Sequence, residues 1–224
     1  MILETHVHAD HLSAAPFIKA QTGAWISIGV HIREVQRIFR PVFGLTDLES
    51  DPSDFDRPFD DGDRFPIGEL DVEVLHVPSH IPADVTYRIG DHAFVGDTLF
   101  MPDYGIARAD FPGGDARTLY RSIRRLLSLP SETRLFLRHD YKAPGRDDYR
   151  WETTVGEQRR SSVHVHGGMS EDDFVAMREQ RDAGLPVPKL LLPSMQVNIR
   201  GGHFDEAEAN GVTYLRIPVK WKKH

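Results

Sequence analysis

A run of seven residues, Thr5-His6-Val7-His8-Ala9-Asp10-His11, constrains this chain more than any other part of its sequence. Three imidazoles and one carboxylate fall within six positions of each other. These groups are the usual protein ligands of zinc, iron and manganese. Residues 1–5 are predicted to form a short strand, so His6 and His8 project to the same side of it. The sequence therefore predicts a metal-binding cluster at a strand end, where loops usually carry a protein's chemistry.

The composition limits how such a metal can be held and where the chain can act. The 224 residues include no cysteine, which excludes disulfides and thiolate ligands, so nitrogen and oxygen must bind any metal. The net charge of −7 argues against non-specific binding to nucleic acid. No apolar run approaches a membrane span, and no signal segment is recognisable before the histidines. We therefore expect a small-molecule substrate, no nucleic-acid or membrane partner, and a cytoplasmic location.

Strands and helices alternate along the sequence, which predicts an α/β fold with layered sheets. Apolar runs and alternating patterns predict strands at residues 1–5, 24–29, 70–77, 84–89, 93–95 and 133–137. Apolar residues at helical spacing predict helices at residues 12–20, 31–40, 154–161 and 170–182, and one that begins after Asp115 and ends before Pro130. The pair Gly90-Asp91 predicts a hairpin turn. The acidic residues 46–63 are predicted to form a solvated loop, and residues 186–193 an apolar segment between prolines.

Three further candidate ligands, His80, Asp97 and His139, each lie where a predicted strand stops. Taken alone, each would be interpreted as an ordinary polar residue. Their recurrence at strand ends, together with the cluster that begins at His6, indicates one shared site.

Several motifs together resemble those of a known family. The run His6-x-His8-x-Asp10-His11 resembles the signature of the metallo-β-lactamase superfamily. With Gly96-Asp97-Thr98-Leu99-Phe100, Arg108-Ala109-Asp110-Phe111 and His139-Asp140-Tyr141, the chain is similar to the persulfide dioxygenases, a branch close to hydroxyacylglutathione hydrolase. The resemblance implies an αββα sandwich, here lacking its first strands, that has a metal cleft at one edge between two sheets. It covers a domain at residues 1–204, followed by a C-terminal tail at residues 205–224.

The resemblance implies two alternative metal sites, and the sequence leaves both open. In the dioxygenase branch, one iron(II) ion would be bound by two histidines and one carboxylate, His6, His80 and Asp97. Four further residues would then orient these ligands from outside: His8, Asp10, His11 and His139. In the hydrolases, two zinc(II) ions would use all seven residues, with Asp97 between the ions. Such a pair lowers the pKa of a shared water and generates hydroxide.

The dioxygenase branch also implies which residues act on glutathione persulfide and O2. Arg108 matches the family pattern in its loop, and Tyr141 is expected to face the substrate. The expected catalytic residues are therefore Tyr141, Arg108 and Asp10. Glutathione persulfide carries two carboxylates and a sulfur anion, so an acidic chain needs local cations to bind it. Arg108, Tyr141 and Arg159 are expected to bind it, and further candidate cations are Lys142 and Arg146.

Three functions follow as alternatives. The first is an iron-dependent persulfide dioxygenase that forms sulfite and glutathione. The second is a dinuclear zinc hydrolase that acts on a thioester, a lactone or a β-lactam. The third is an inactive metal-binding scaffold, suggested by Ser79-His80-Ile81 where the family usually has Gly-His-Thr.

The expected lack of outer strands has a consequence for assembly. A sheet without its outer strands exposes backbone groups and apolar surface, here expected near Trp25, Ile26 and Ile28. We therefore expect a homo-oligomer that buries these residues.

Overall fold

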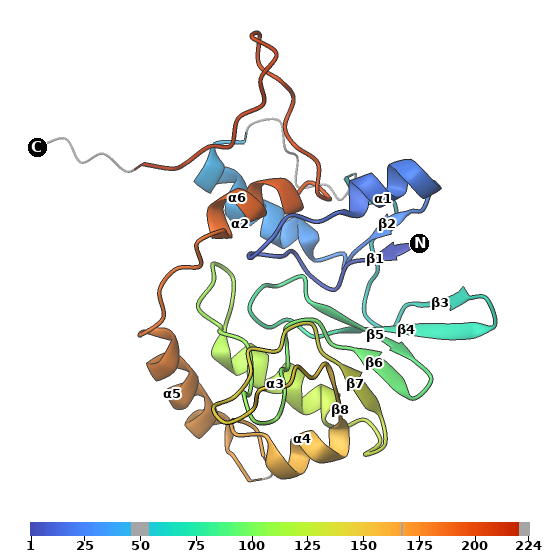
Figure 1. Cartoon of the computed structure of the whole chain (residues 1–224), viewed down its shortest axis with the longest axis vertical. Coiled ribbons are helices and arrows are strands. Elements are labelled where there is room, and N and C mark those ends of the chain that lie inside the picture. Colours follow the sequence, from blue (N-terminus) through green and yellow to red (C-terminus); the bar gives the residue numbers. More distant parts are fainter. Residues whose placement is uncertain (46–53, 167, 220–224) are drawn as a thin grey trace, which may run out of the picture.

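The elements of this computed structural model, which describes residues 1–45, 54–166 and 168–219, lie in layers (Figure 1). A small sheet near the N-terminus pairs two short parallel strands, β1 (Ile2–Leu3) and β2 (Ile26–Ser27). Three helices pack around this sheet: α1 (Ala15–Thr22), α2 (Ile32–Phe43) and α6 (Leu191–Asn198). Together, this small sheet and its three helices form one half of the molecule (Figure 1).

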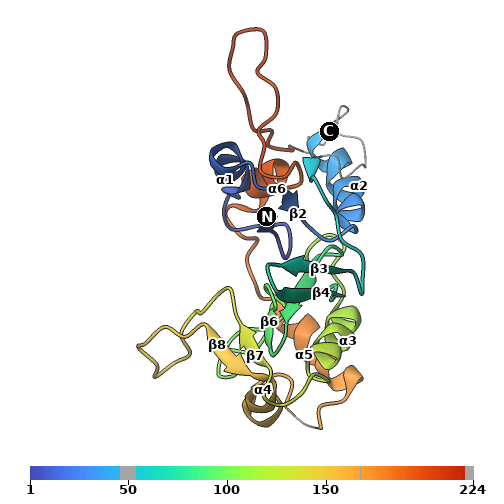
Figure 2. The same ribbon diagram turned by 90° about the vertical axis from the view of Figure 1, so that its right-hand side faces the viewer.

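A mixed sheet of six strands forms the next layer, in the order β3-β4-β5-β6-β7-β8. Its strands are β3 (Arg64–Ile67), β4 (Leu70–His76), β5 (Val85–Ile89), β6 (His92–Phe94), β7 (Arg134–Phe136) and β8 (Glu152–Thr154). The helices of the other half pack beside this sheet (Figures 1 and 2): α3 (Ala116–Leu126), α4 (Val155–Ser161) and α5 (Glu171–Asp182). The layers confirm the expected α/β fold with layered sheets.

The direction of three strands in the large sheet decides where the site forms. Strands β4 and β6 are both antiparallel to β5, and β7 is parallel to β6. Hence β4, β6 and β7 all run the same way, and their C-terminal ends meet at one edge of the sheet. The residues that follow those ends are His80, Asp97 and His139, so strand direction alone brings these side chains to a common edge.

Three apolar clusters hold the layers together. One lies between the large sheet and helices α3 to α5, with Leu135, Ile123 and Phe174 fully buried. A second fills the half formed by β1, β2, α1, α2 and α6, and the third lies against β3, β4 and β5. Ile26 and Ile28 are 0% and 1% exposed in the second cluster, so the prediction that they line an open face is wrong. Trp25 is 54% exposed, and the expected homo-oligomer stays a prediction.

Two strands and one helix were not predicted from the sequence. Strands β3 and β8 are short sheet edges, and each buries only one side chain, Phe65 and Thr153, so neither has a clear alternating pattern. Helix α6 begins at Leu191 and continues through Pro193. Proline is tolerated there because the backbone N–H groups of a first helical turn have no partner within the helix.

The other predicted elements are present, with ends that differ by a few residues. Asp115 caps α3 by accepting a hydrogen bond from the backbone N–H of Thr118, and Ser170 caps α5. Gly90, at φ 59°, forms the hairpin turn between β5 and β6. Of the predicted acidic loop, residues 46–53 lie outside the described part of the chain.

Residues 205–219 contain no helix or strand and project from the body as a long loop (Figures 1 and 2). The domain boundary at residue 204 stays a prediction. Within the described ranges, no helix is both long and apolar enough to cross a membrane.

We predict that Gly29→Ala destabilises the fold by about 1–3 kcal/mol, because it overpacks the contact between the two sheets. A Cβ at Gly29 would lie 2.7 Å from the backbone oxygen of Ala83 and 2.7 Å from Val85 Cγ1. Urea unfolding measures the change. Gly184→Ala is the control, since its Cβ would lie 3.6 Å from the nearest atom, the backbone oxygen of Arg181. Equal unfolding midpoints for the two variants would contradict the prediction.

Candidate metal centre

Three side chains from separate segments of the chain converge on one point. His6 follows β1, His80 follows β4 and Asp97 follows β6, and one ligand atom from each lies within 4.8 Å of the others. His6 Nε2 lies 3.4 Å from Asp97 Oδ2. Among the described residues, this is the one group of three or more such side chains that meets the 4.8 Å limit. Two imidazoles and one carboxylate in this arrangement can bind one metal ion and leave other coordination positions open.

Each of the two histidines is held through the ring nitrogen that faces away from this point. His6 Nδ1 lies 3.0 Å from Thr5 Oγ1, which leaves Nε2 facing Asp97. His80 Nδ1 lies 2.9 Å from Asp84 Oδ2, which leaves its Nε2 free. Burial lowers the pKa of His80, but the charge and hydrogen bond of Asp84 outweigh that effect and raise it overall. A carboxylate behind a histidine is the arrangement that fixes ring orientation in metal sites.

Ser79 contributes to this support at the position where the family usually has glycine. Its hydroxyl donates a hydrogen bond to Asp84 and lies 3.1 Å from His80 Nδ1. Within the described residues, Lys142 is the one non-glycine residue with a positive φ, so the backbone at Ser79 does not require glycine. Ile81 is 1% exposed and packs in the core. The departure from Gly-His-Thr is therefore accommodated without backbone strain.

The carboxylate of Asp97 fits a bound cation. Its Oδ1 is buried and has no hydrogen-bond partner among the described residues. Burial acts to raise the pKa of Asp97, but the charges of His6, His80 and His139 outweigh it and lower that pKa well below the usual range. An ionised, buried oxygen without a hydrogen bond is costly, and coordination to a metal removes that cost.

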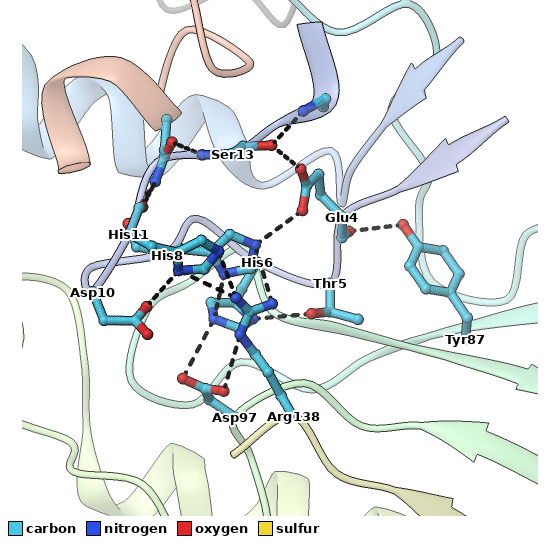
Figure 3. A network of polar contacts seen from close by, with 12 residues as sticks. Glu4, Thr5, His6, His8, Asp10, His11, Ser13, Tyr87, Asp97 and Arg138 are labelled. Atoms are coloured by element: carbon cyan, nitrogen blue, oxygen red, sulfur yellow. Dashed lines mark hydrogen bonds and ion pairs between the residues drawn. The ribbon is translucent and has the colours of Figure 1, made fainter. Parts of the chain in front are cut away.

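His8 belongs to the same cluster and is tied to a carboxylate that sequence reasoning missed. Its Nδ1 lies 3.0 Å from His6 Nε2, and its Nε2 lies 3.0 Å from Glu4 Oε2 (Figure 3). Glu4 also accepts a hydrogen bond from Ser13, and its backbone oxygen accepts one from Tyr87. Burial and the neighbouring His6 lower the pKa of His8 to about 3, so this imidazole is neutral at physiological pH.

The remaining predicted ligands lie beside the first three. His139 Nε2 lies 3.3 Å from Asp10 Oδ2 and 3.7 Å from Asp97 Oδ1. His11 Nδ1 lies 3.0 Å from Asp10 Oδ1, and His11 Nε2 lies 2.7 Å from the Arg138 guanidinium. All seven predicted ligands thus gather in one place. Their side chains contact one another in pairs, and Arg138 reaches in among them.

A cavity of about 270 Å³ opens onto this cluster. Its lining combines possible metal ligands with residues expected to meet a substrate: Asp10, His80, Asp97, His139, Arg108 and Tyr141. Apolar side chains such as Phe100, Ile106, Phe111 and Leu185 line other parts of it. The cavity therefore offers a polar metal-facing side and an apolar side to a small molecule.

Tyr141 is oriented in this cavity by ring stacking. Its ring stacks on His139 at 5.4 Å and on Tyr104 at 4.9 Å between centroids. Burial, together with the charges of Asp97 and Asp10, raises the pKa of Tyr141 to about 12. The phenol therefore keeps its proton at neutral pH and can donate a hydrogen bond to an anion.

Arg108 lines the cavity while it is also bound to an aspartate. Its Nε and Nη2 donate to the two carboxylate oxygens of Asp110 at 2.6 and 2.7 Å, and Nη1 donates to the Pro186 oxygen at 2.8 Å. The side chain is thus fixed in the cavity wall by a bidentate pair.

The structure corrects the expectation that Arg159 binds the substrate. Its guanidinium donates to the backbone oxygens of Leu127 and Leu129, at the end of α3, and it does not line the cavity. Of the two other candidate cations, Lys142 lies over the Tyr149 ring at 4.1 Å, and Arg146 pairs with Asp140 and Asp103.

Two arginines of α5 line the cavity instead, and sequence reasoning missed both. Arg178 pairs with Asp182 at 2.6 Å. Arg181 is exposed, and within the described part of the chain it has no ion pair. The helical spacing of the two arginines was the available signal, but nothing in the sequence placed α5 beside the metal cluster.

Asn198, the last residue of α6, fixes the loop that carries His8 and His11, and sequence reasoning missed it as well. Its amide nitrogen donates to the backbone oxygens of both residues at 2.8 Å, and its oxygen accepts from Ser13 N at 2.9 Å. The side chain is 4% exposed, so these groups are shielded from water.

We predict that Asn198→Ala and Asn198→Asp each destabilise the protein by about 2–4 kcal/mol, because buried backbone oxygens lose their donor. Metal affinity should fall by roughly 10- to 100-fold, since the histidine loop loses its support. Thermal unfolding and metal titration measure the two effects. Gln196→Ala is the control on the same helix, because its amide bonds to Arg216 and Leu192, away from the cluster. Metal affinity equal to that of the unmodified protein would rule out this role for Asn198.

A pH dependence follows from Asp140, which organises the loop after His139. Its carboxylate accepts from Arg146 at 2.5 and 2.6 Å, and from the backbone N–H groups of Lys142 and Arg150. These hydrogen bonds hold the pKa of Asp140 well below its ordinary value of 3.8, and the bond from Arg146 has the largest effect. A carboxyl group whose pKa is lower in the folded state than in the unfolded state stabilises the fold at any pH above its unfolded-state pKa. This stabilisation is lost as the pH falls through its folded-state pKa.

We therefore predict that Asp140→Asn lowers the urea midpoint of the metal-free protein at pH 7, and that the deficit shrinks as the pH falls below 3.8. Asp147→Asn, an exposed neighbour, is the control and should change little. A deficit that stays constant down to acid pH would show that the charge of Asp140 is not what stabilises the loop.

The known proteins that this chain resembles include some named as hydrolases and some named as persulfide dioxygenases. A probable metallo-hydrolase of Burkholderia pseudomallei is 52% identical over 97% of this chain and 78% of its own length. A beta-lactamase hydrolase-like protein of Xylella fastidiosa is 53% identical over 97% of this chain, which spans half of that protein. The human mitochondrial persulfide dioxygenase ETHE1 is 27% identical over 89% of this chain and 68% of its own length.

A solved structure and a family profile agree with the fold. The crystal structure of ETHE1 from Myxococcus xanthus superposes with a TM-score of 0.70 at 30% identity, covering 90% of this chain and 76% of that one. Residues 2–139, more than half of the chain, match the profile of the metallo-beta-lactamase superfamily. The chain therefore belongs to the metallo-beta-lactamase superfamily.

Proposed function

We propose that this chain is a persulfide dioxygenase that uses one iron(II) ion, bound by His6, His80 and Asp97, to oxidise glutathione persulfide with O2. The observation that carries the proposal is the convergence of these three side chains within 4.8 Å. Two histidines and one carboxylate on one face are the ligand set of non-haem iron(II) oxygenases. The second group of possible ligands lies beside the first, with His139 Nε2 at 3.3 Å from Asp10 Oδ2 and 3.7 Å from Asp97 Oδ1.

The reaction balances as glutathione persulfide, O2 and water giving glutathione and sulfite with two protons. The outer sulfur loses four electrons, and O2 gains them. Bound iron supplies the redox chemistry that links the two changes. The protein's part is to hold the persulfide with its outer sulfur at the ligand cluster and its glutathione portion along the cavity wall.

Named residues of the cavity suit that task. Tyr141 keeps its phenolic proton, so it can donate a hydrogen bond to the sulfur anion beside His139. Arg108 and Arg181 line the same cavity and can meet the carboxylates of the glutathione portion. Asp10 is held by His11 and His139 at the edge of the cluster, where it can accept a hydrogen bond from water. Phe100 and Phe111 keep part of the cavity apolar, which limits its water content.

A dinuclear zinc hydrolase is the second candidate, and the names of the relatives favour it. The two proteins at 52% and 53% identity are named for hydrolysis, whereas the human dioxygenase shares 27% identity. All seven ligands of such a site are present in the cluster. The metal count and the reaction with O2 separate the candidates, because hydrolysis consumes no O2.

The direct experiment is an oxygen-electrode assay of the iron-loaded protein with glutathione persulfide. We expect persulfide-dependent O2 uptake with sulfite formed in equal amount. The zinc-loaded protein is tested in parallel on a thioester, a lactone and a β-lactam. Hydrolysis by the zinc form, together with no O2 uptake by the iron form, would replace the first candidate with the second.

The assignment of three iron ligands predicts that two alanine variants lose different amounts of metal. His80→Ala removes one of three iron ligands, so we expect iron to be largely lost along with the activity. His139→Ala leaves those ligands in place, so we expect about one iron per chain to remain while turnover falls. Metal analysis after gel filtration measures both. Should His139→Ala lose iron as completely as His80→Ala, the assignment of the three ligands is wrong.

A further inference from the structure

Arg138 is a cation inside the ligand cluster that the proposed function has not used. It precedes His139 after β7, and its side chain reaches up beside Asp97 into the group of histidines (Figure 3). Its Nη2 lies 2.7 Å from His11 Nε2, and its Nη1 lies 3.3 Å from His8 Nε2. Its Nε lies 3.8 Å from Asp97 Oδ1. The guanidinium therefore contacts His8 and His11, which follow β1, and also lies near Asp97, which follows β6.

These contacts are made to groups that a second metal ion would need. In the dinuclear arrangement the second ion would use Asp10, His11 and His139, with Asp97 shared between the ions. Arg138 Nη2 contacts His11 Nε2, while His11 Nδ1 faces Asp10 at 3.0 Å. Arg138 Nη2 also lies 3.3 Å from His11 Nδ1, so the guanidinium sits against both nitrogens of this ring, in the space that a second ion would need. The guanidinium also faces the Asp97 oxygen that lies 3.7 Å from His139.

We propose that Arg138 takes the place of the second metal ion and limits this site to one metal. A guanidinium keeps its positive charge at any pH that a protein tolerates, so it supplies permanently the charge that a second cation would bring to Asp97 and His11. The same charge repels a divalent cation from the position between Asp10, His11 and His139. The first position uses the other oxygen of Asp97, Oδ2, which lies 3.4 Å from His6 Nε2, whereas Arg138 and His139 face Oδ1.

Partial burial of the two side chains makes this charge effective. The Arg138 side chain is 27% exposed and the Asp97 side chain is 15% exposed, so water screens their interaction only in part. A residue outside the seven expected ligands therefore decides between the two metal arrangements that the sequence left open.

This inference deepens the proposed function, since it explains why one metal would bind where the family's seven-ligand set allows two. Its test is a zinc(II) and cobalt(II) titration of the unmodified protein and of its variants R138K and R138M. Metal analysis after gel filtration gives the number of ions per chain, and the cobalt absorption spectrum reports coordination. No catalytic assay is needed.

We expect about one ion per chain in the unmodified protein and in R138K, which keeps a positive charge, and about two in R138M. Adding H11A to R138M should return the count to about one, which locates the second ion. R138Q, a polar neutral variant, should behave as R138M does, and near-UV circular dichroism checks that each variant is folded.

Two results would overturn the inference. One is two ions in the unmodified protein, since Arg138 would then not exclude the second. The other is one ion in both R138M and R138Q, since the second position would then be closed for another reason. The second result leaves the proposed dioxygenase function intact, whereas failure of O2 uptake in the iron-loaded protein removes that function without affecting the metal count.

Discussion

The buried carboxylate of Asp97 is the constraint on which the site depends. It lies at the C-terminal end of a central strand, ionised, with one oxygen that has no hydrogen bond. An isolated buried charge costs several kcal/mol, so the fold must gather cations or metal around it. His6, His80, His139 and Arg138 all face it, and they arrive from three different segments, which follow β1, β4 and β7. The sheet topology makes this possible because β4, β6 and β7 run in one direction.

Much of the candidate site was predictable from the sequence because its residues sit in short, distinctive motifs. The six positions from His6 to His11 could be interpreted as a metal cluster, and His80, Asp97 and His139 could be placed at strand ends. All seven do meet in the structure. A strand with several apolar residues in a short run, such as β4, was also predictable, whereas the edge strands β3 and β8, which bury one side chain each, were not.

The residues that support and restrict the site were not predictable, since their roles come from contacts across long stretches of sequence. Asn198 holds the His8 to Ser13 loop from 190 residues away, and Arg138 reaches His11 across 127 residues. Neither position belongs to a motif of its own. Arg159 failed as a prediction for the same reason, because its guanidinium donates to the backbone oxygens of Leu127 and Leu129, about 30 residues earlier in the chain, and not into the cavity.

The central claim is that this cluster binds a single metal between His6, His80 and Asp97. Anomalous diffraction from crystals loaded with iron under anaerobic conditions, or with zinc, tests it most directly, because the signal locates each ion independently of any activity. The account predicts one anomalous peak, bounded by His6 Nε2, the free His80 nitrogen and Asp97, with the Arg138 guanidinium still in contact with His11. Two peaks on either side of Asp97, with Arg138 displaced, would contradict it.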